Sequence, residues 1–329
     1  MARRGFRTAI TPQTLRSNSP FEKIMRKILF IRKFKKLSGG QIKVREYFEH
    51  CMQHPKLAPY VYFTPDSCYT QAPLWRDVPA ERIVRELVPE AYDALFIAGK
   101  DWDVLPGNLR DVPIINLVQH VKHADEGNAR FAYLQRRAFR ICVSPEVFEA
   151  ISPHAQGPTC VIPNGIALEL FAPQGEKRRN AILLWARKNP ALGQRLHETL
   201  LARGYDSSLL LDYLSREKFA EALQRAEIFV ALTNRTEGFY LPALEGMAGG
   251  CAVVCADAVG NRGFCVHEKT CLTPAWGDFQ EHLQMIERLA QDDNLKQALQ
   301  HNGAEQAQFF SLQNERARFY AFLDEHLWH

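Results

Sequence analysis

The chain has 329 residues, of which 46% are hydrophobic and 24% are charged, as is typical of a soluble globular protein with two domains of ordinary size. No apolar run approaches the about 20 residues that cross a bilayer, and the N-terminus lacks the apolar core of a signal peptide. We therefore expect a cytoplasmic protein without a membrane span.

The basic charge is concentrated at the start of the sequence. Residues 1–36 carry eleven of the 41 basic side chains and a single acid, Glu22. A basic segment of this kind makes an anionic membrane surface a candidate partner, which would place the protein peripherally at the inner face of the membrane. A solvated tail is the plain alternative. The segment has no recognised nucleic-acid motif, so nucleic acid is not an expected partner.

Short apolar runs recur along the chain and predict parallel strands. They lie at 27–31, 58–63, 94–98, 113–118, 140–144, 159–162, 181–186, 208–214, 227–232 and 251–256. Amphipathic segments between them predict helices, of which the clearest are 41–54, 80–92, 192–204 and 215–226, with Ser215 as an N-cap. Alternating strands and helices predict an α/β protein with parallel sheets covered by helices on both faces.

The predicted elements divide into two doubly wound domains that face each other across a cleft. A stretch with two prolines, two glycines and a charged cluster, 161–180, suits a linker. We expect a first domain at 1–163, in which 1–25 form the basic leading segment, and a second domain at 164–311. Residues 312–329 predict a C-terminal helix, capped by Ser311, that crosses back to the first domain.

Four cysteines lie close together between residues 251 and 271. Their spacing is C-x3-C followed by C-x5-C, which lacks the C-x2-C pairs of common zinc modules. The tripeptide "DWD" (101–103) could in isolation hold a metal, but its context gives no support. We expect no metal and no cofactor.

The stretch "TNRTEGFYLPALEGMAGGCAVV" (233–254) carries the strongest signal for chemistry. A strand ends at Thr233, a polar loop containing Glu237 follows, and Pro242 suits the first turn of the next helix. The loop and helix N-terminus offer free N–H groups that favour phosphate. Glu245 lies one turn into the helix, roughly 12 Å from Glu237 if the segment is helical. Two carboxylates at this distance suit the hexose and ribose hydroxyls of a nucleotide diphosphate sugar.

Cations and glycines at other predicted strand ends fit the same ligand. Arg187 and Lys188 in "WARKNP" follow the first strand of the second domain and suit a diphosphate. Gly39 and Gly40 in "SGGQ" follow the first strand of the chain, where glycine lets the backbone approach a ligand.

Together these residues resemble the retaining nucleotide-sugar glycosyltransferases of the GT-B fold, in particular their large fourth family. The matching elements are Glu237 and Glu245 in a Glu, seven residues, Glu pattern, "IPNGI" at 162–166, the pair after the "AILLWA" strand, "SGGQ", and a histidine, His120, in "NLVQHVKHAD". The loop "VGNRGFC" (259–265) stands where the family often has Gly-Gly. The likeness covers roughly residues 27–325.

The resemblance implies a role for each residue. Glu237 would contact the donor hexose near the reacting carbon, and Glu245 would hold the ribose. Arg187 and Lys188 would neutralise the departing diphosphate. The remaining donor-site residues would be Gly238, Phe239 and Tyr240, through their backbone, with Gly39 and Gly40 in the first domain. His120 would contact the sugar or place the acceptor hydroxyl. His123 is a weaker candidate for the same role.

The resemblance therefore predicts a metal-independent retaining glycosyltransferase. Its donor would be a UDP- or GDP-linked sugar and its acceptor a glycan or lipid-linked molecule in polysaccharide or glycolipid biosynthesis, held on the side of the first domain. Two alternatives keep the fold. One is a sugar-nucleotide epimerase or phosphorylase, and the other is a non-catalytic protein that binds sugar nucleotides.

Overall fold

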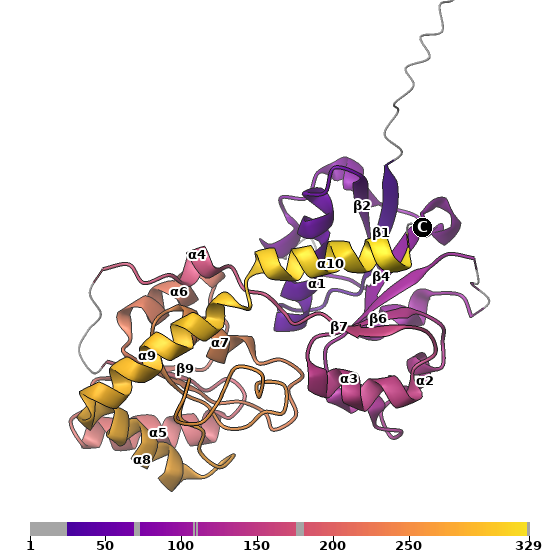
Figure 1. Cartoon of the computed structure of the whole chain (residues 1–329). Coiled ribbons are helices and arrows are strands. Elements are labelled where there is room, and N and C mark those ends of the chain that lie inside the picture. The colour runs from indigo at the N-terminus through magenta and orange to yellow at the C-terminus, as the bar shows by residue number, and fades with distance from the viewer. Residues whose placement is uncertain (1–24, 69–72, 108, 110, 176–180, 328–329) are drawn as a thin grey trace, which may run out of the picture.

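The computed structural model of the protein contains two parallel sheets, each with an apolar core packed against both of its faces (Figure 1). The structure describes residues 25–68, 73–107, 109, 111–175 and 181–327. Most of the basic leading segment lies outside these residues, so its membrane contact stays a prediction. None of the described helices is both long and apolar enough to cross a bilayer.

The first sheet has seven described strands in the order β3-β2-β1-β4-β5-β6-β7. Neighbouring strands pair in parallel throughout. The strands are β1 Arg26–Arg32, β2 Leu57–Phe63, β3 Ile83–Val84, β4 Ala94–Ala98, β5 Ile114–Val118, β6 Phe139–Cys142 and β7 Thr159–Val161. The helices of this domain are α1 Gly39–Met52, α2 Phe131–Leu134 and α3 Pro145–Ile151, with several short 3-10 turns.

The middle of strand β1, residues 28–31, is continuously apolar. Ile28 and Phe30 belong to the core on one face of the sheet, whereas Leu29 and Ile31 belong to the core on the opposite face. Successive strand residues point to opposite faces, so a strand segment covered on both sides is apolar at successive positions.

The second sheet has four described strands in the order β11-β10-β8-β9, again all parallel. The strands are β8 Ile182–Trp185, β9 Ser207–Leu210, β10 Ile228–Ala231 and β11 Ala252–Val254. The helices are α4 Leu168–Phe171, α5 Pro190–Ala202, α6 Arg216–Arg225, α7 Leu241–Ala248, α8 Phe279–Gln291 and α9 Asp293–Gln308. The predicted two doubly wound domains are thus confirmed. The Ser215 hydroxyl accepts from the Lys218 N–H, as expected of the N-cap of α6.

The last helix, α10 (Leu312–His326), leaves the second domain and lies beside α1 in the first (Figure 1). The Phe319 ring stands edge-on to Tyr47 with centroids 4.9 Å apart, and the Tyr320 hydroxyl donates to the His50 carbonyl at 2.6 Å. The apolar face of α10 therefore completes the first domain's core rather than that of the second.

The two crossings between the domains run side by side. The Ile166 N–H donates to the Phe310 carbonyl (2.8 Å), and the Leu312 N–H donates to the Ile166 carbonyl (3.0 Å). A Cβ on Gly165 would lie 2.4 Å from the Ser311 carbonyl oxygen, so this close approach requires glycine.

A buried ion cluster fixes this junction. The Lys43 ammonium donates to the Gly165 carbonyl (2.9 Å) and contacts the carboxylates of Glu46 (2.5 Å) and Glu315. Glu315 also accepts from the Gly165 N–H. Because α1, the first crossing and α10 share these contacts, the orientation of the two domains is tied to one buried site.

Two expectations about local structure were wrong. The predicted helix at 80–92 consists of two short 3-10 turns, Ala80–Arg82 and Pro89–Ala91, on either side of strand β3. Pro89 lacks an N–H and disfavours helical geometry in the residue before it, so the segment is broken near its C-terminal end. Strand β9 ends at Leu210 rather than 214, because β8 beside it offers only four residues for pairing.

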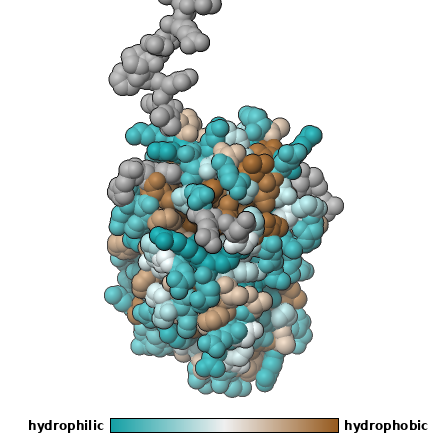
Figure 2. Space-filling view, turned by 90° about the vertical axis from the view of Figure 1, so that its right-hand side faces the viewer, coloured by the Kyte–Doolittle hydropathy of each residue, from teal (hydrophilic) through white to brown (hydrophobic). Residues whose placement is uncertain are grey.

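The surface in Figure 2 is mostly hydrophilic, and its hydrophobic residues gather mainly in the upper half. The apolar parts of the strands are not exposed, since residues 28–31 of β1 and the side chains of β4 are almost wholly buried.

Candidate active site

A cavity of about 720 Å³ lies between the two domains. Its walls come from the loops after β1, β4 and β5 in the first domain and after β8, β9 and β10 in the second. These are carboxyl ends of parallel strands, where ligands bind in open α/β sheets. The volume is within the range of ligand sites.

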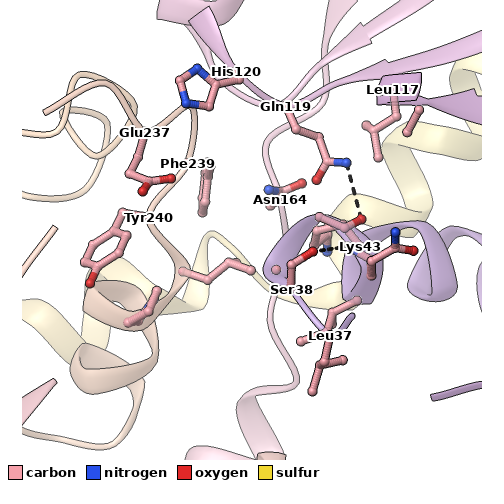
Figure 3. Close-up of a pocket in the computed structure, with 18 of the residues that line it drawn as sticks. Leu37, Ser38, Lys43, Leu117, Gln119, His120, Asn164, Glu237, Phe239 and Tyr240 are labelled. Atoms are coloured by element: carbon pink, nitrogen blue, oxygen red, sulfur yellow. Dashed lines mark hydrogen bonds between the residues drawn. The ribbon is translucent and has the colours of Figure 1, made fainter. Parts of the chain in front are cut away.

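Glu237 lies in the loop between β10 and α7, and one of its two carboxylate oxygens has partners in the protein. Its Oε1 accepts from the Asn234 amide (3.0 Å) and pairs with the Lys188 ammonium (3.0 Å). The described residues provide no partner for Oε2. Figure 3 shows Glu237 and Tyr240 at one side of the cavity, with His120 above them. The predicted Lys188 thus binds the predicted acid, which orients the carboxylate and balances its charge.

The loop carrying Glu237 is packed against the first domain. A Cβ on Gly238 would lie 2.3 Å from the Gln119 carbonyl oxygen and 3.0 Å from the His120 Cα. On its other side, a Cβ on Gly260 would lie 1.9 Å from the Gly238 carbonyl. The "VGNRGFC" loop therefore packs directly against the backbone of the Glu237 loop. Gly238 itself does not line the cavity, and its role as a phosphate donor stays a prediction.

The aromatic pair after Gly238 anchors the same loop. The buried Tyr240 hydroxyl donates to the Leu232 carbonyl at 2.7 Å. The Phe239 ring packs against Phe264 and Phe310, with centroids 5.0 and 5.8 Å away. Both residues also line the cavity. Their side chains fix the loop, while their backbone N–H groups remain the predicted phosphate donors.

Glu245 is not an exposed helix residue. It is 2% exposed on α7, and its carboxylate pairs with the guanidinium of Arg216. Burial opposes the charge of Arg216, but the neighbouring carboxylates of Glu245 and Glu46 raise its pKa above the ordinary value. Arg216 lines the cavity and was not predicted. Its position in the sequence could have indicated a binding role, since Arg216 is the first residue of α6 after the loop at the carboxyl end of β9.

Arg187 also reaches the cavity from the turn before α5. Its guanidinium carbon lies 3.6 Å from the centroid of the Tyr213 ring, within the range of cation–π contact. The described residues offer it no acid. The Tyr213 ring therefore positions the Arg187 guanidinium, but no described acid neutralises its charge.

His120 faces the acids from the first domain, at the start of the turn after β5. Its Nδ1 accepts from the Lys122 N–H at 3.1 Å, which puts the proton of the neutral ring on Nε2. Burial lowers the pKa of His120, although the charge of Glu237 acts in the opposite direction. Burial and the charge of Arg130 lower the pKa of His123 to about 3. Both rings are therefore neutral at physiological pH.

The glycines after β1 lie where the domains meet. The Gln119 amide donates to the Gly40 carbonyl at 3.3 Å. A Cβ on Gly39 would lie 3.6 Å from the Leu241 side chain of α7. Both glycines line the cavity at the N-terminus of α1.

Asp101 of "DWD" has a structural role. It is buried, pairs with Arg32, and accepts from the backbone N–H groups of Lys33 and Ala98 at 2.9 Å each. Asp103 accepts from the Tyr133 hydroxyl instead. The two carboxylates thus have different partners within the first domain.

Two facing doubly wound domains with this cleft define the GT-B fold of glycosyltransferases. Residues 166–292 match the family model described as glycosyl transferases group 1. Sucrose-phosphate synthase from Thermosynechococcus elongatus is similar in structure, with a TM-score of 0.70, 16% identity, and coverage of 91% of this chain and 98% of that one.

Two further solved structures are similar. HepE from Anabaena in complex with UDP-glucose has a TM-score of 0.73 and 15% identity, over 91% of this chain and 99% of that one. A glycosyltransferase from Rickettsia africae has a TM-score of 0.67 and 12% identity, over 92% and 98%. No curated protein matches the sequence. The predicted GT-B fold is confirmed, and the second domain carries the group 1 glycosyl transferase sequence pattern.

Proposed function

We propose that the protein is a retaining glycosyltransferase that moves a sugar from a UDP- or GDP-linked donor to a glycan or lipid-linked acceptor. The observation that carries this proposal is the convergence of Glu237, Glu245, Arg187 and His120 on one interdomain cavity. The similar HepE structure is a complex with UDP-glucose, which supports a nucleotide-sugar donor here.

The donor would lie along the second domain. Glu245, oriented by Arg216, would accept from the ribose hydroxyls, because a carboxylate offers only acceptors. Glu237, fixed through Oε1 by Lys188 and Asn234, would present Oε2 to the hexose hydroxyls. The diphosphate would lie between them, beside Arg187 and the N-terminus of α7.

Transfer would break the bond between the anomeric carbon and the diphosphate oxygen and form a bond to the acceptor hydroxyl oxygen. The hydroxyl proton would pass to the departing diphosphate. Negative charge develops on that leaving group, and Arg187, Lys188 and the α7 N–H groups are positioned to stabilise it, so the proposed reaction requires no metal. Neutral His120 could donate from Nε2 to the sugar.

The proposed setting is polysaccharide or glycolipid biosynthesis in the cytoplasm. The basic residues of the leading segment support a peripheral position at an anionic membrane face. This part of the proposal concerns residues 1–24, which lie outside the described chain.

Calorimetric titration with UDP, GDP and their sugars tests the donor site. We expect one nucleoside diphosphate to bind at least about tenfold more tightly than the other. Incubation of the preferred sugar nucleotide with and without acceptor extracts then tests the reaction. Transfer of the sugar with release of the diphosphate is expected. An epimerised donor would instead indicate an epimerase, and absence of binding to every nucleotide would overturn the proposal.

A further inference from the structure

The cavity has many more cations than acids among the described residues that line it. Its three acids are Asp101, Glu237 and Glu245. Each already pairs with a cation, namely Arg32, Lys188 and Arg216 respectively. None of the three is therefore free to neutralise a further cation.

Several cations of the first-domain wall lack an acid of their own. Lys100, Lys122 and Arg130 line the cavity and form no ion pair with any described residue. Lys33 and Lys35 also line it and share a single acid, Asp66, at 3.0 and 3.1 Å. A cleft lined by one sign of charge concentrates ligands of the opposite sign.

The fold explains why these cations gather. Lys33 and Lys35 follow β1, Lys100 follows β4, and Lys122 follows β5. The three strands are neighbours in the sheet and parallel. Their carboxyl ends therefore meet at one edge, which faces the second domain.

The excess charge lies close to the proposed reaction centre. Burial lowers the pKa of His120, Glu237 raises it, and the charges of Lys122, Lys188 and Arg130 lower it further. His120 thus lies among cations from both domains and next to the acid proposed to hold the hexose.

We propose that the acceptor carries a phosphate group close to its accepting hydroxyl, and that Lys122, Arg130 and Lys100 bind this phosphate. The inference rests on the proposed function, in which Arg187 and Lys188 are already committed to the donor diphosphate. Several cations without partners suit a phosphate, which offers several charged oxygens, and the Arg130 guanidinium can bind two of them at once.

Matched acceptors test the inference with the full chain and its preferred sugar nucleotide. The soluble arm compares hexose 6-phosphates with the same unphosphorylated hexoses. The lipid arm compares vesicles of phosphatidylcholine with vesicles that also contain phosphatidylglycerol, which has a phosphodiester and free hydroxyls. We expect sugar transfer to the phosphorylated member of one arm, at least about tenfold above its control. Equal transfer to phosphorylated and unphosphorylated hexoses would overturn the inference.

The variant K122Q/R130Q links the effect to these side chains. Loss of two charge-assisted contacts should raise KM for the phosphorylated acceptor about tenfold or more. The control K56Q removes an exposed lysine before β2, at the opposite edge of the sheet, and should leave KM unchanged. UDP or GDP binding by K122Q/R130Q shows that the variant is folded.

The outcomes separate the two proposals. An unchanged acceptor KM in K122Q/R130Q would overturn the phosphate-bearing acceptor while leaving the glycosyltransferase in place. Failure of the wild-type chain to bind any nucleoside diphosphate would overturn the proposed function itself.

Discussion

The two walls of the cleft are built differently. In the second domain, each acid is held by a cation of the same domain, as Glu237 is by Lys188 and Glu245 by Arg216. In the first domain, cations from the ends of three strands exceed the acids that could pair with them. The second-domain wall is thus nearly balanced before any ligand arrives, with only Arg187 of its described cations lacking an acid, whereas the first-domain wall keeps a larger excess.

This difference bears on how each wall recognises a ligand. Charges that are already paired fix the carboxylate acceptors in place, so little reorganisation is needed when hydroxyls bind. An excess of flexible lysines attracts an anion but specifies its position less sharply. We infer that the second wall is specialised for one donor shape and that the first wall selects mainly by charge.

Substitution of Glu237 should have the largest effect on the balanced wall. E237Q keeps the size of the side chain but removes the charge that pairs with Lys188. We expect the rate of sugar transfer to fall about 10²–10³-fold, because one preorganised polar contact at the reaction centre is lost. Turnover of the sugar nucleotide, with binding of the nucleoside diphosphate measured in parallel, checks this.

E305Q is the matched control for E237Q. Glu305 is exposed on α9 and does not line the cavity, and among the described residues its one ion-pair partner is the exposed His301. The control should transfer sugar like the wild type. Wild-type turnover by E237Q would contradict the role proposed for this acid.

Removal of Arg216 should leave the second acid of the same wall, Glu245, without its cation. R216M leaves Glu245 buried without its cation, which we expect to lower the free energy of unfolding by about 2–3 kcal/mol, since Arg216 is itself partly exposed. Urea unfolding measures this cost. In R216M/E245M both charges are gone, so stability should recover while nucleoside diphosphate binding stays weak. Wild-type stability in R216M alone would show that the pair between Arg216 and Glu245 does not stabilise the fold.

The sequence predicted the balanced wall better than the other. Glu237 and Glu245 belong to one contiguous loop and helix, so their placement follows from local rules for strands, prolines and helix starts. Arg216 was missed because it is 29 residues away from its partner, and no local pattern indicates a contact between two helices.

The charge of the first wall can be predicted only when the order of the strands in the sheet is known. Lys100, Lys122 and Arg130 come together only because β4 and β5 are neighbours in the sheet. The predicted segments for these strands were correct, but adjacent sequence gives no indication that their loops share a cavity. The wrongly predicted helix at 80–92 has a local cause, since the segment has an amphipathic pattern but also contains Pro89, which interrupts a helix.

The contact between the walls can be tested at Gly238. In G238A the new Cβ would meet the Gln119 carbonyl at 2.3 Å, so the Glu237 loop must move away from the first domain. We expect a loss of about 2 kcal/mol in unfolding free energy, as in other cases of overpacking, together with slower transfer. G263A is the matched control, because a Cβ there meets nothing within 4 Å. Equal stability of the two variants would show that the walls are not in close contact.

The smallest expected effect is on the pH dependence of stability and concerns His123 on the first wall. Burial and the charge of Arg130 lower its pKa in the folded protein to about 3, whereas an unfolded chain has a histidine pKa near 6.5. Between these values the unfolded state binds a proton that the folded state does not. The stability tied to this ring is therefore complete above about pH 6.5 and falls as the pH decreases toward 3.

H123N should remove that part of the pH dependence. On going from pH 7.5 to 5.5, we expect the wild type to lose about 1 kcal/mol more unfolding free energy than H123N, measured by urea unfolding at both pH values. H301N, which replaces an exposed histidine on α9, should behave like the wild type. If H123N and the wild type lose equal stability, neither burial nor the charge of Arg130 lowers the pKa of His123, and the excess charge of the first wall does not act on this ring.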